Sequence, residues 1–162
     1  MEPKGFVFES LETMGIAFEY VDHPPALTTE DADTYIEGRE GVRTKTLFLC
    51  NRRGAAYYLV VMDDKKRLDM KRLEELTGEK GMKFCSEERL MNKLGLTGGS
   101  VSLFGLLNNS ERDINICLDK EMLAEKTATF LANVNTCTVF ISMEDLIKFV
   151  TALGFNYEAL EL

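Results

Sequence analysis

Residues 44–62 read TKTLFLC, NRRG and AAYYLVVM in succession. The first and third blocks, Thr44 to Cys50 and Ala55 to Met62, are apolar and rich in residues that favour β-strands. The block between them ends in Gly54, which can adopt the positive φ that a tight turn needs. This stretch therefore predicts a β-hairpin, around which the other segments are interpreted.

Upstream of the hairpin, the pattern predicts a helix, a strand and a second helix. The first helix covers Gly5 to Met14 and stops at Gly15. Residues 16–21 alternate as a strand does, and the prolines that follow end it because proline cannot donate to a ladder. Thr28 or Thr29 is a suitable N-cap for a short helix through Tyr35.

Downstream, helices and strands follow one another without regular βαβ alternation. Helices are predicted over residues 69–76 and 86–94 and from Ser142 to residue 153, with strands at 114–118 and 137–141. This mixture favours an α+β fold over a doubly wound sheet. Residues 1–162 contain no internal repeat or low-complexity linker, so a single domain is expected.

Composition excludes several classes of protein. Hydrophobic residues make up 45% and charged residues 28% of the 162 positions, which is typical of a globular protein rather than a disordered one. No apolar run approaches the ~20 residues of a membrane span, and the N-terminus does not resemble a signal peptide. We therefore expect a cytoplasmic protein without a membrane partner.

The net charge of −8 bears on nucleic-acid binding. A protein that grips a long stretch of phosphates usually presents a basic face, so DNA is not an expected partner. Contact with one short end of an RNA stays compatible with this charge. Arg52, Arg53 and the basic run 65–67 are interpreted as solvated loop residues.

The familiar catalytic and metal-binding sets are missing from the sequence. None of the four cysteines belongs to a C-x-x-C pair, and the chain has one histidine, so neither a zinc site nor another metal site is expected. The cysteines are interpreted as reduced, mostly buried thiols. No G-x-S-x-G, Walker A, Rossmann or H-E-x-x-H motif is present, and no cofactor is expected.

Three features have both a structural and a functional interpretation. Lys45, at the start of a strand, either protects a sheet edge from aggregation or serves a site. The glycine-rich segment 98–105 either makes a tight connection under the core or offers backbone N–H groups to a carbonyl oxygen or oxyanion. The polar residues 133–136 either form a turn or belong to the same site.

Several segments, taken in order, resemble a known family over residues 5–156. They are Val21–Pro25, Thr44–Leu49, Tyr58–Val61, Phe84–Met91, Leu94–Ser102, Phe104–Asn108, Asn135-Thr136 and the closing helix at Asp145-Leu146. The family is the prolyl-tRNA synthetase-associated domain, also called the YbaK type. Within it, the chain is most similar to the freestanding prolyl-tRNA editing proteins.

The resemblance implies a fold, an activity and a site. The implied fold is a mixed β-sheet curled towards a barrel, with flanking helices. The implied activity is metal-independent ester hydrolysis that deacylates mischarged tRNA, with Ala-tRNA(Pro) as the first candidate substrate and prolyl-tRNA synthetase as a further candidate partner. Lys45, Gly99 and Ser100 are the implied catalytic residues. The implied substrate-binding residues are Thr46, Val101, Ser102, Leu103, Phe104, Gly105, Leu131, Asn133, Asn135 and Thr136.

The sequence departs from the family pattern at three places. Thr46 stands where the family has asparagine, Leu103 where it has the proline of G-x-x-x-P, and Leu131-Ala132 where it has the His-Pro of F-H-P-x-x-N-T. All three lie in segments that the family uses for its site. Two alternatives therefore stay open: a deacylase for another small residue such as serine or cysteine, and a silent module that binds tRNA or a synthetase.

Overall fold

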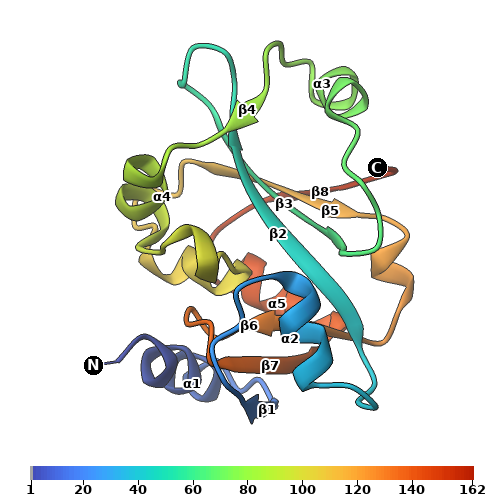
Figure 1. Cartoon of the computed structure of the whole chain (residues 1–162). Coiled ribbons are helices and arrows are strands. Elements are labelled where there is room, and N and C mark those ends of the chain that lie inside the picture. The colour runs from blue at the N-terminus through green and yellow to red at the C-terminus, as the bar shows by residue number, and fades with distance from the viewer. Residues whose placement is uncertain (1) are drawn as a thin grey trace.

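The protein, described over residues 2–162 by a computed structural model, combines five α-helices with one sheet (Figure 1). The helices are α1 (Pro3–Thr13), α2 (Thr29–Tyr35), α3 (Met70–Thr77), α4 (Glu87–Leu94) and α5 (Met143–Ala152). The strands are β1 (Glu19–Asp22), β2 (Val42–Cys50), β3 (Tyr57–Asp63), β4 (Lys83–Phe84), β5 (Ile114–Asp119), β6 (Thr127–Leu131), β7 (Cys137–Ser142) and β8 (Tyr157–Leu160). Short 3₁₀ turns are η1 (Gly98–Ser100), η2 (Leu103–Asn108) and η3 (Met122–Ala124).

The long strand β2 joins the two halves of the sheet. The strand order is β1-β7-β6-β2-β3-β5-β8, and β4 pairs with β2 outside this path. Pairing is antiparallel within β1–β7, β6–β7 and β2–β3 and parallel within β2–β6, β3–β5 and β5–β8. Figure 1 shows β2 running across the molecule, with β6 and β7 beside one end and β3 and β5 beside the other. The predicted α+β class and mixed sheet are confirmed.

Local signals set most element ends where the sequence predicts them. Gly54 has φ 65° in the β2–β3 turn, and Gly78 and Gly95 end α3 and α4 in the left-handed conformation. At the start of α5, the Ser142 hydroxyl accepts a hydrogen bond from the Asp145 N–H at 3.0 Å. These positions depend on short-range backbone chemistry, which a sequence carries directly.

The structure differs from the sequence-based prediction mainly at four strands, namely β1, β4, β6 and β8. The strand predicted over 16–21 begins only at Glu19, because Ile16 is drawn into the core beside Val7 and Leu11. The two-residue β4 and the mostly exposed β8 show no alternating pattern. The apolar strand that precedes the polar segment 133–136 is β6, which the sequence left without bounds.

Candidate active site

A cavity of about 500 Å³ lies along β2, between α2 on one side and α4 with η1 on the other. This volume falls in the range of small-ligand sites. Five of the predicted site residues line it, namely Lys45, Thr46, Gly99, Val101 and Leu131. The wall also contains Leu27, Asp33, Phe84, Cys85, Glu87 and Thr138. The tertiary fold therefore brings Lys45 and Thr46, part of the glycine-rich segment, and Leu131 to one cavity.

The middle of β2 has an unpaired edge that faces this cavity. On the edge opposite β3, strand β6 pairs only with Val42 and Arg43, and β4 pairs only with Leu49 and Cys50. The residues between these two short pairings lack a neighbouring strand on that side, among residues 2–162. An unpaired strand edge presents backbone donors and acceptors, so this gap adds backbone polar groups to the polar side chains of the cavity wall.

Thr46 contributes its backbone to this gap. The Asp64 N–H donates to Arg43 O, which shows that odd-numbered residues of β2 direct their backbone groups towards β3. Successive residues in an antiparallel pair alternate in this respect, so even-numbered residues face the other edge, as the bond from the Cys85 N–H to Phe48 O confirms. The N–H and C=O of Thr46 therefore point into the cavity.

Lys45 lies at the α2 end of the cavity. Its ammonium donates a hydrogen bond to Lys66 O in the turn after β3. The Lys66 side chain in turn binds Asp119, which is fully buried, at 3.0 Å and Glu121 at 3.1 Å. An ammonium has three protons. One of those of Lys45 is thus used to position the group, and two stay available to a ligand.

The glycine-rich turn η1 lies at the other end of the cavity. Phe48 lies three positions after Lys45 on the same strand, about 10 Å away. Gly98 and Gly99 line the wall beyond Phe48. The Gly98 N–H already donates to Glu87 Oε2 at 3.2 Å, and the Ser100 N–H to Thr97 O at 3.0 Å. One of the two interpretations of the sequence gave segment 98–105 free N–H groups, and this is wrong for Gly98, Ser100, Phe104 and Gly105, whose N–H groups all have partners.

Two N–H groups of the turn have no such partner. The amides of Gly99 and Val101 make no hydrogen bond to another group in residues 2–162, and both residues line the cavity. Gly99 has an ordinary negative-side φ, and a Cβ built on it would meet no atom within 4 Å. Neither the backbone nor the packing of this chain requires a glycine here, so its missing side chain leaves room in the cavity.

Four of the predicted site residues pack behind the wall. Leu103 and Phe104 have no exposed surface, Ser102 is 1% exposed, and its hydroxyl accepts from the Phe104 N–H. A Cβ on Gly105 would lie 2.7 Å from a methyl carbon of Leu96. These residues do not line the cavity, and the glycine at 105 allows the close approach of η2 to α4. Ser100 is half-buried beside the wall without lining it.

The polar segment 133–136 supports the cavity from outside. Asn133 adopts φ 62°, and its side-chain amide donates to Phe104 O at 3.2 Å. The carbonyls of Asn135 and Thr136 accept from the N–H groups of Ala26 and His23, both at 2.8 Å. None of the three predicted polar residues lines the cavity. They hold the segment that carries Ala26 and Leu27 to its rim.

His23 binds on both sides of its ring. Nδ1 lies 2.9 Å from Pro24 O, and Nε2 lies 2.9 Å from the hydroxyl of Thr138, which lines the cavity. A carbonyl can only accept, so Nδ1 carries the proton in the neutral ring and Nε2 accepts from Thr138. His23 also stacks on Tyr35, with ring centroids 5.1 Å apart. It therefore lies behind the wall and orients Thr138.

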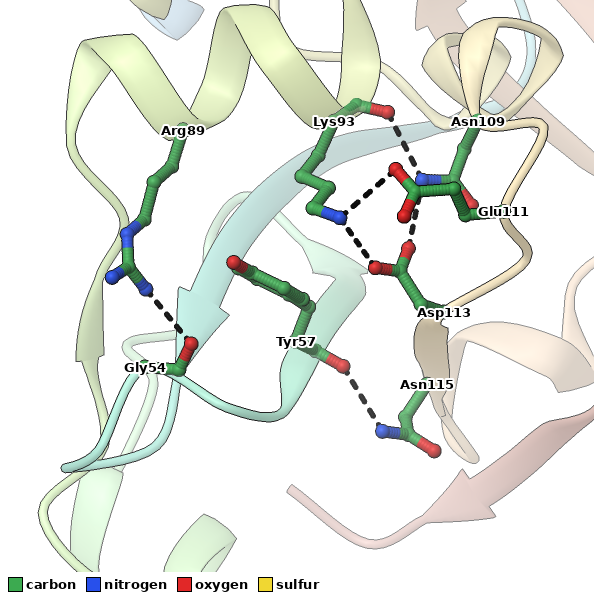
Figure 2. A network of polar contacts seen from close by, with 8 residues as sticks. All are labelled: Gly54, Tyr57, Arg89, Lys93, Asn109, Glu111, Asp113 and Asn115. Carbon is green, nitrogen blue, oxygen red and sulfur yellow. Dashed lines mark hydrogen bonds and ion pairs between the residues drawn. The ribbon is translucent and has the colours of Figure 1, made fainter.

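Helix α4, which carries Glu87 and Leu90 of the wall, is anchored by the polar network in Figure 2. The Lys93 ammonium binds Asp113 at 2.6 Å and Glu111 at 3.1 Å. Nearer the start of the helix, the Arg89 guanidinium reaches the β2–β3 turn and donates to Gly54 O at 3.0 Å. These contacts fix the helix against the hairpin and so fix the width of the cavity.

Cys85 is the cysteine on the cavity wall. Burial and the neighbouring Cys50 thiol raise its pKa to about 12. A thiol with this pKa stays protonated at neutral pH, and the thiolate is the nucleophilic form. Cys85 is therefore unsuited to nucleophilic catalysis. All four cysteines are unpaired by disulfides, and three are buried, as predicted.

Two carboxyl groups meet at the Lys45 end. Asp33 of α2 lines the cavity, and Asp64 lies behind it with a buried oxygen, Oδ2, that meets no donor. Burial, with the hydrogen bond and negative charge of Asp33, raises the pKa of Asp64 to about 8. A protonated Asp64 can donate to Asp33, which removes the repulsion between the two. With this pKa, Asp64 is mostly protonated at neutral pH.

This pair makes stability depend on pH. A carboxyl whose pKa is raised on folding favours the folded state at low pH, and this contribution is lost as the pH rises towards about 8. Asp64→Asn imitates the protonated form, so its advantage in unfolding free energy over the wild type should grow from pH 5 to pH 8. Urea unfolding at several pH values measures it, with Glu144→Gln on the exposed face of α5 as control. Curves that stay parallel for Asp64→Asn and the wild type would contradict the assignment.

Two statements about the described residues bear on possible ligands and location. Residues 2–162 contain no group of three or more His, Cys, Asp or Glu placed to hold a metal ion. In the same residues, no helix combines the length and the apolar character that crossing a membrane requires.

The comparison with known proteins decides the family. Residues 23–149 match the model of the aminoacyl-tRNA editing domain, and this range includes every residue of the cavity wall. The chain belongs to this family. The editing-domain family implies aminoacyl-tRNA deacylase activity with mischarged tRNA as substrate, in agreement with the resemblance in the sequence.

Relatives of this editing domain extend over its full length. It is 34% identical to the prolyl-tRNA editing protein ProX of Acetoanaerobium sticklandii, over the whole chain and 99% of ProX. It is 25% identical to prolyl-tRNA synthetase associated domain-containing protein 1 of Bos taurus, over 91% of this chain and 88% of that protein. The crystal structure of a candidate trans-editing enzyme for prolyl-tRNA synthetase matches its fold with a TM-score of 0.76 at 19% identity, over 100% of this chain and 99% of the other.

Some wall residues of the editing domain were not predicted as site residues. Asp33 lies in a short helix outside the segments that carry the resemblance, whereas Phe84 and Glu87 lie within the resembling segment Phe84–Met91 but were not assigned to the site. The unpaired edge at Thr46 cannot be recognised from the sequence, because it follows from where β6 and β4 stop pairing with β2. Only the pairing of distant strands reveals it.

Proposed function

We propose that this editing domain hydrolyses the ester of alanyl-tRNA(Pro), in trans and without a metal ion. The observation that carries the proposal is the cavity lined by Lys45, by the open edge at Thr46, and by Gly99 and Val101, whose amides have no other partner in residues 2–162. These groups can bind the aminoacyl end of a tRNA at several points. The full-length similarity to ProX favours tRNA(Pro) as the carrier.

The reaction needs few catalytic groups from the protein, because an aminoacyl ester is already activated. A water attacks the ester carbon, the carbonyl oxygen becomes an oxyanion, and the ribose oxygen then leaves with a proton to give tRNA and free amino acid. In the proposal, the Gly99 and Val101 N–H groups stabilise the oxyanion, a role worth about 3–4 kcal/mol for one donor in other hydrolases. The ribose hydroxyl beside the ester assists the water.

Lys45 and Thr46 orient the substrate in this scheme. The Lys45 ammonium is a point charge suited to a ribose or phosphate oxygen of the terminal nucleotide. The Thr46 C=O accepts a charge-assisted hydrogen bond from the α-ammonium of the amino acid. Correct placement of water and ester contributes to the rate by itself.

The choice of alanine has a physical basis. A proline pocket in a synthetase cannot strongly reject alanine, because each missing methylene is worth only about 1–3 kcal/mol. A second site can admit the smaller residue. Leu131 and Thr46, two departures from the family pattern, both line this cavity, so serine or cysteine is the second candidate substrate and prolyl-tRNA synthetase is a candidate partner that would deliver the tRNA.

Release of labelled amino acid from Ala-, Ser-, Cys- and Pro-tRNA(Pro) tests the proposal. We expect alanine to be released and proline to be retained. Faster release of serine or cysteine would show that the Leu131 wall has changed the preference. Binding of these tRNAs without hydrolysis of any of them would show a silent binding module instead.

A further inference from the structure

Four cations lie beyond the Phe84 end of the cavity, without lining it, although the chain as a whole is acidic. The group formed by these cations is called the rim below. Arg52 and Arg53 lie in the β2–β3 turn, Lys80 follows α3, and Lys83 begins β4; all four are exposed. The Arg52 N–H donates to Lys80 O at 3.1 Å, and Lys83 pairs with Cys50 in the strand register. In Figure 1 the hairpin and the segment that leads to β4 lie together at the top of the molecule.

These cations are free of carboxylate partners. Each ion pair within residues 2–162 involves other cations, namely Lys4, Arg39, Lys66 and Lys93. Glu79, next to Lys80 in the chain, has a buried carboxylate oxygen. Burial, and then the negative charge of Glu79, raise the pKa of Tyr58 to about 12. The Glu79 side chain is therefore directed inward. The rim keeps a local positive charge on a protein whose net charge is −8.

An exposed aromatic ring lies between this rim and the cavity. Phe84, directly after Lys83, lines the cavity, yet the residue is 60% exposed. A phenylalanine gains nothing from water contact, whereas an exposed ring beside cations suits a nucleic-acid base, which stacks on aromatic faces irrespective of its identity. The Arg89 bond to Gly54 O holds the hairpin turn in place (Figure 2).

From this arrangement, and resting on the deacylase proposed above, we infer that the rim binds the single-stranded 3′ end of the tRNA. The terminal nucleotide and its amino acid enter the cavity, the preceding base stacks on Phe84, and the phosphates pass over Arg52, Lys80 and Lys83. An acidic protein that must accept one short RNA end needs positive charge only there. The patch confines RNA contact to the mouth of the site.

Charge reversal at the rim tests the inference. Arg52→Glu with Lys80→Glu changes the net charge by −4. Lys120→Glu with Lys148→Glu, at the exposed position directly after β5 and at an exposed position on α5, makes the same change elsewhere. We expect the rim variant to weaken binding of uncharged tRNA at least tenfold and to flatten the dependence of binding on salt. The control should change binding less than threefold. Equal losses in both variants, or no loss in either, would overturn the inference.

Phe84 is tested separately with aminoacyl-tRNA. Phe84→Leu keeps an apolar wall but removes the stacking face, so KM should rise about tenfold, and Phe84→Tyr should restore it. An unchanged KM in Phe84→Leu, or a failure of Phe84→Tyr to restore it, would contradict stacking. Binding of uncharged tRNA needs no hydrolysis. A wild type that binds tRNA through the rim but cleaves no ester would therefore refute the proposed function and leave the binding surface standing.

Discussion

Replacement of Lys45 by alanine should lower kcat/KM for alanyl-tRNA(Pro) at least 100-fold. The ammonium is held in place by Lys66 O and lines the cavity. Lys45 orients the terminal nucleotide in the proposed scheme, and misplacement of a substrate by about 1 Å can by itself cost about 100-fold in rate. Lys45→Met preserves the aliphatic part of the side chain and should lose as much activity, because the proposed role of Lys45 depends on its positive charge. Single-turnover hydrolysis measures the chemical step.

The controls for Lys45 separate catalysis from folding. Lys65→Ala removes an exposed cation from the turn beside Lys66 and should change the rate less than threefold. Thermal unfolding should shift little in Lys45→Ala, since the lost hydrogen bond is worth only about 1 kcal/mol net. Retention of more than a tenth of the wild-type rate in a folded Lys45→Ala protein would remove Lys45 from the proposed mechanism.

A valine at position 99 should lower kcat/KM about 10-fold or more without loss of stability. A Cβ at this position meets no atom within 4 Å, so the fold can accept the side chain, and Gly99 lines the cavity. The substrate would lose room next to the Gly99 and Val101 amides. Steady-state hydrolysis and thermal unfolding, measured on the same preparation, give the two readouts.

Gly105 provides the matched comparison. A Cβ at this position would lie 2.7 Å from a Leu96 carbon and 3.2 Å from the Leu94 Cβ, inside the core. Gly105→Ala should therefore destabilise the fold by about 1–3 kcal/mol, the usual cost of overpacking. If Gly99→Val unfolds as readily as Gly105→Ala, the glycine at 99 has a structural role and the vacant space is not a ligand site.

Short-range sequence signals determine several turns and helix ends of this protein. Gly54 sets the hairpin turn, Ser142 caps α5, and Gly78 and Gly95 end two helices. Each depends on the local conformational preference of one backbone position, so the sequence alone predicts it. The position of Lys45 on a strand, which places it in the cavity wall, follows from the same hairpin.

Contacts between distant segments decided the rest. Leu103 and Phe104 belong to a segment that the sequence assigned to the site, but packing against Phe130 and Phe149 buries Phe104 in the core. Asp64 acquires its raised pKa because the fold buries it and places Asp33, from another element, against it. Arg52, interpreted from sequence as solvated, acquires Lys80 as a neighbour through the fold.

The sequence by itself determined the α+β class, the hairpin, the helix caps and the residue types of the site, because these depend on periodicity and on short-range backbone chemistry. Only the tertiary structure decided which of those residues face the cavity and which lie behind it. It also created the unpaired edge at Thr46 and the basic rim beside Phe84. Both arise where β4 and β6 meet β2, and strand pairing across 33 to 86 positions leaves no local pattern that a sequence can display.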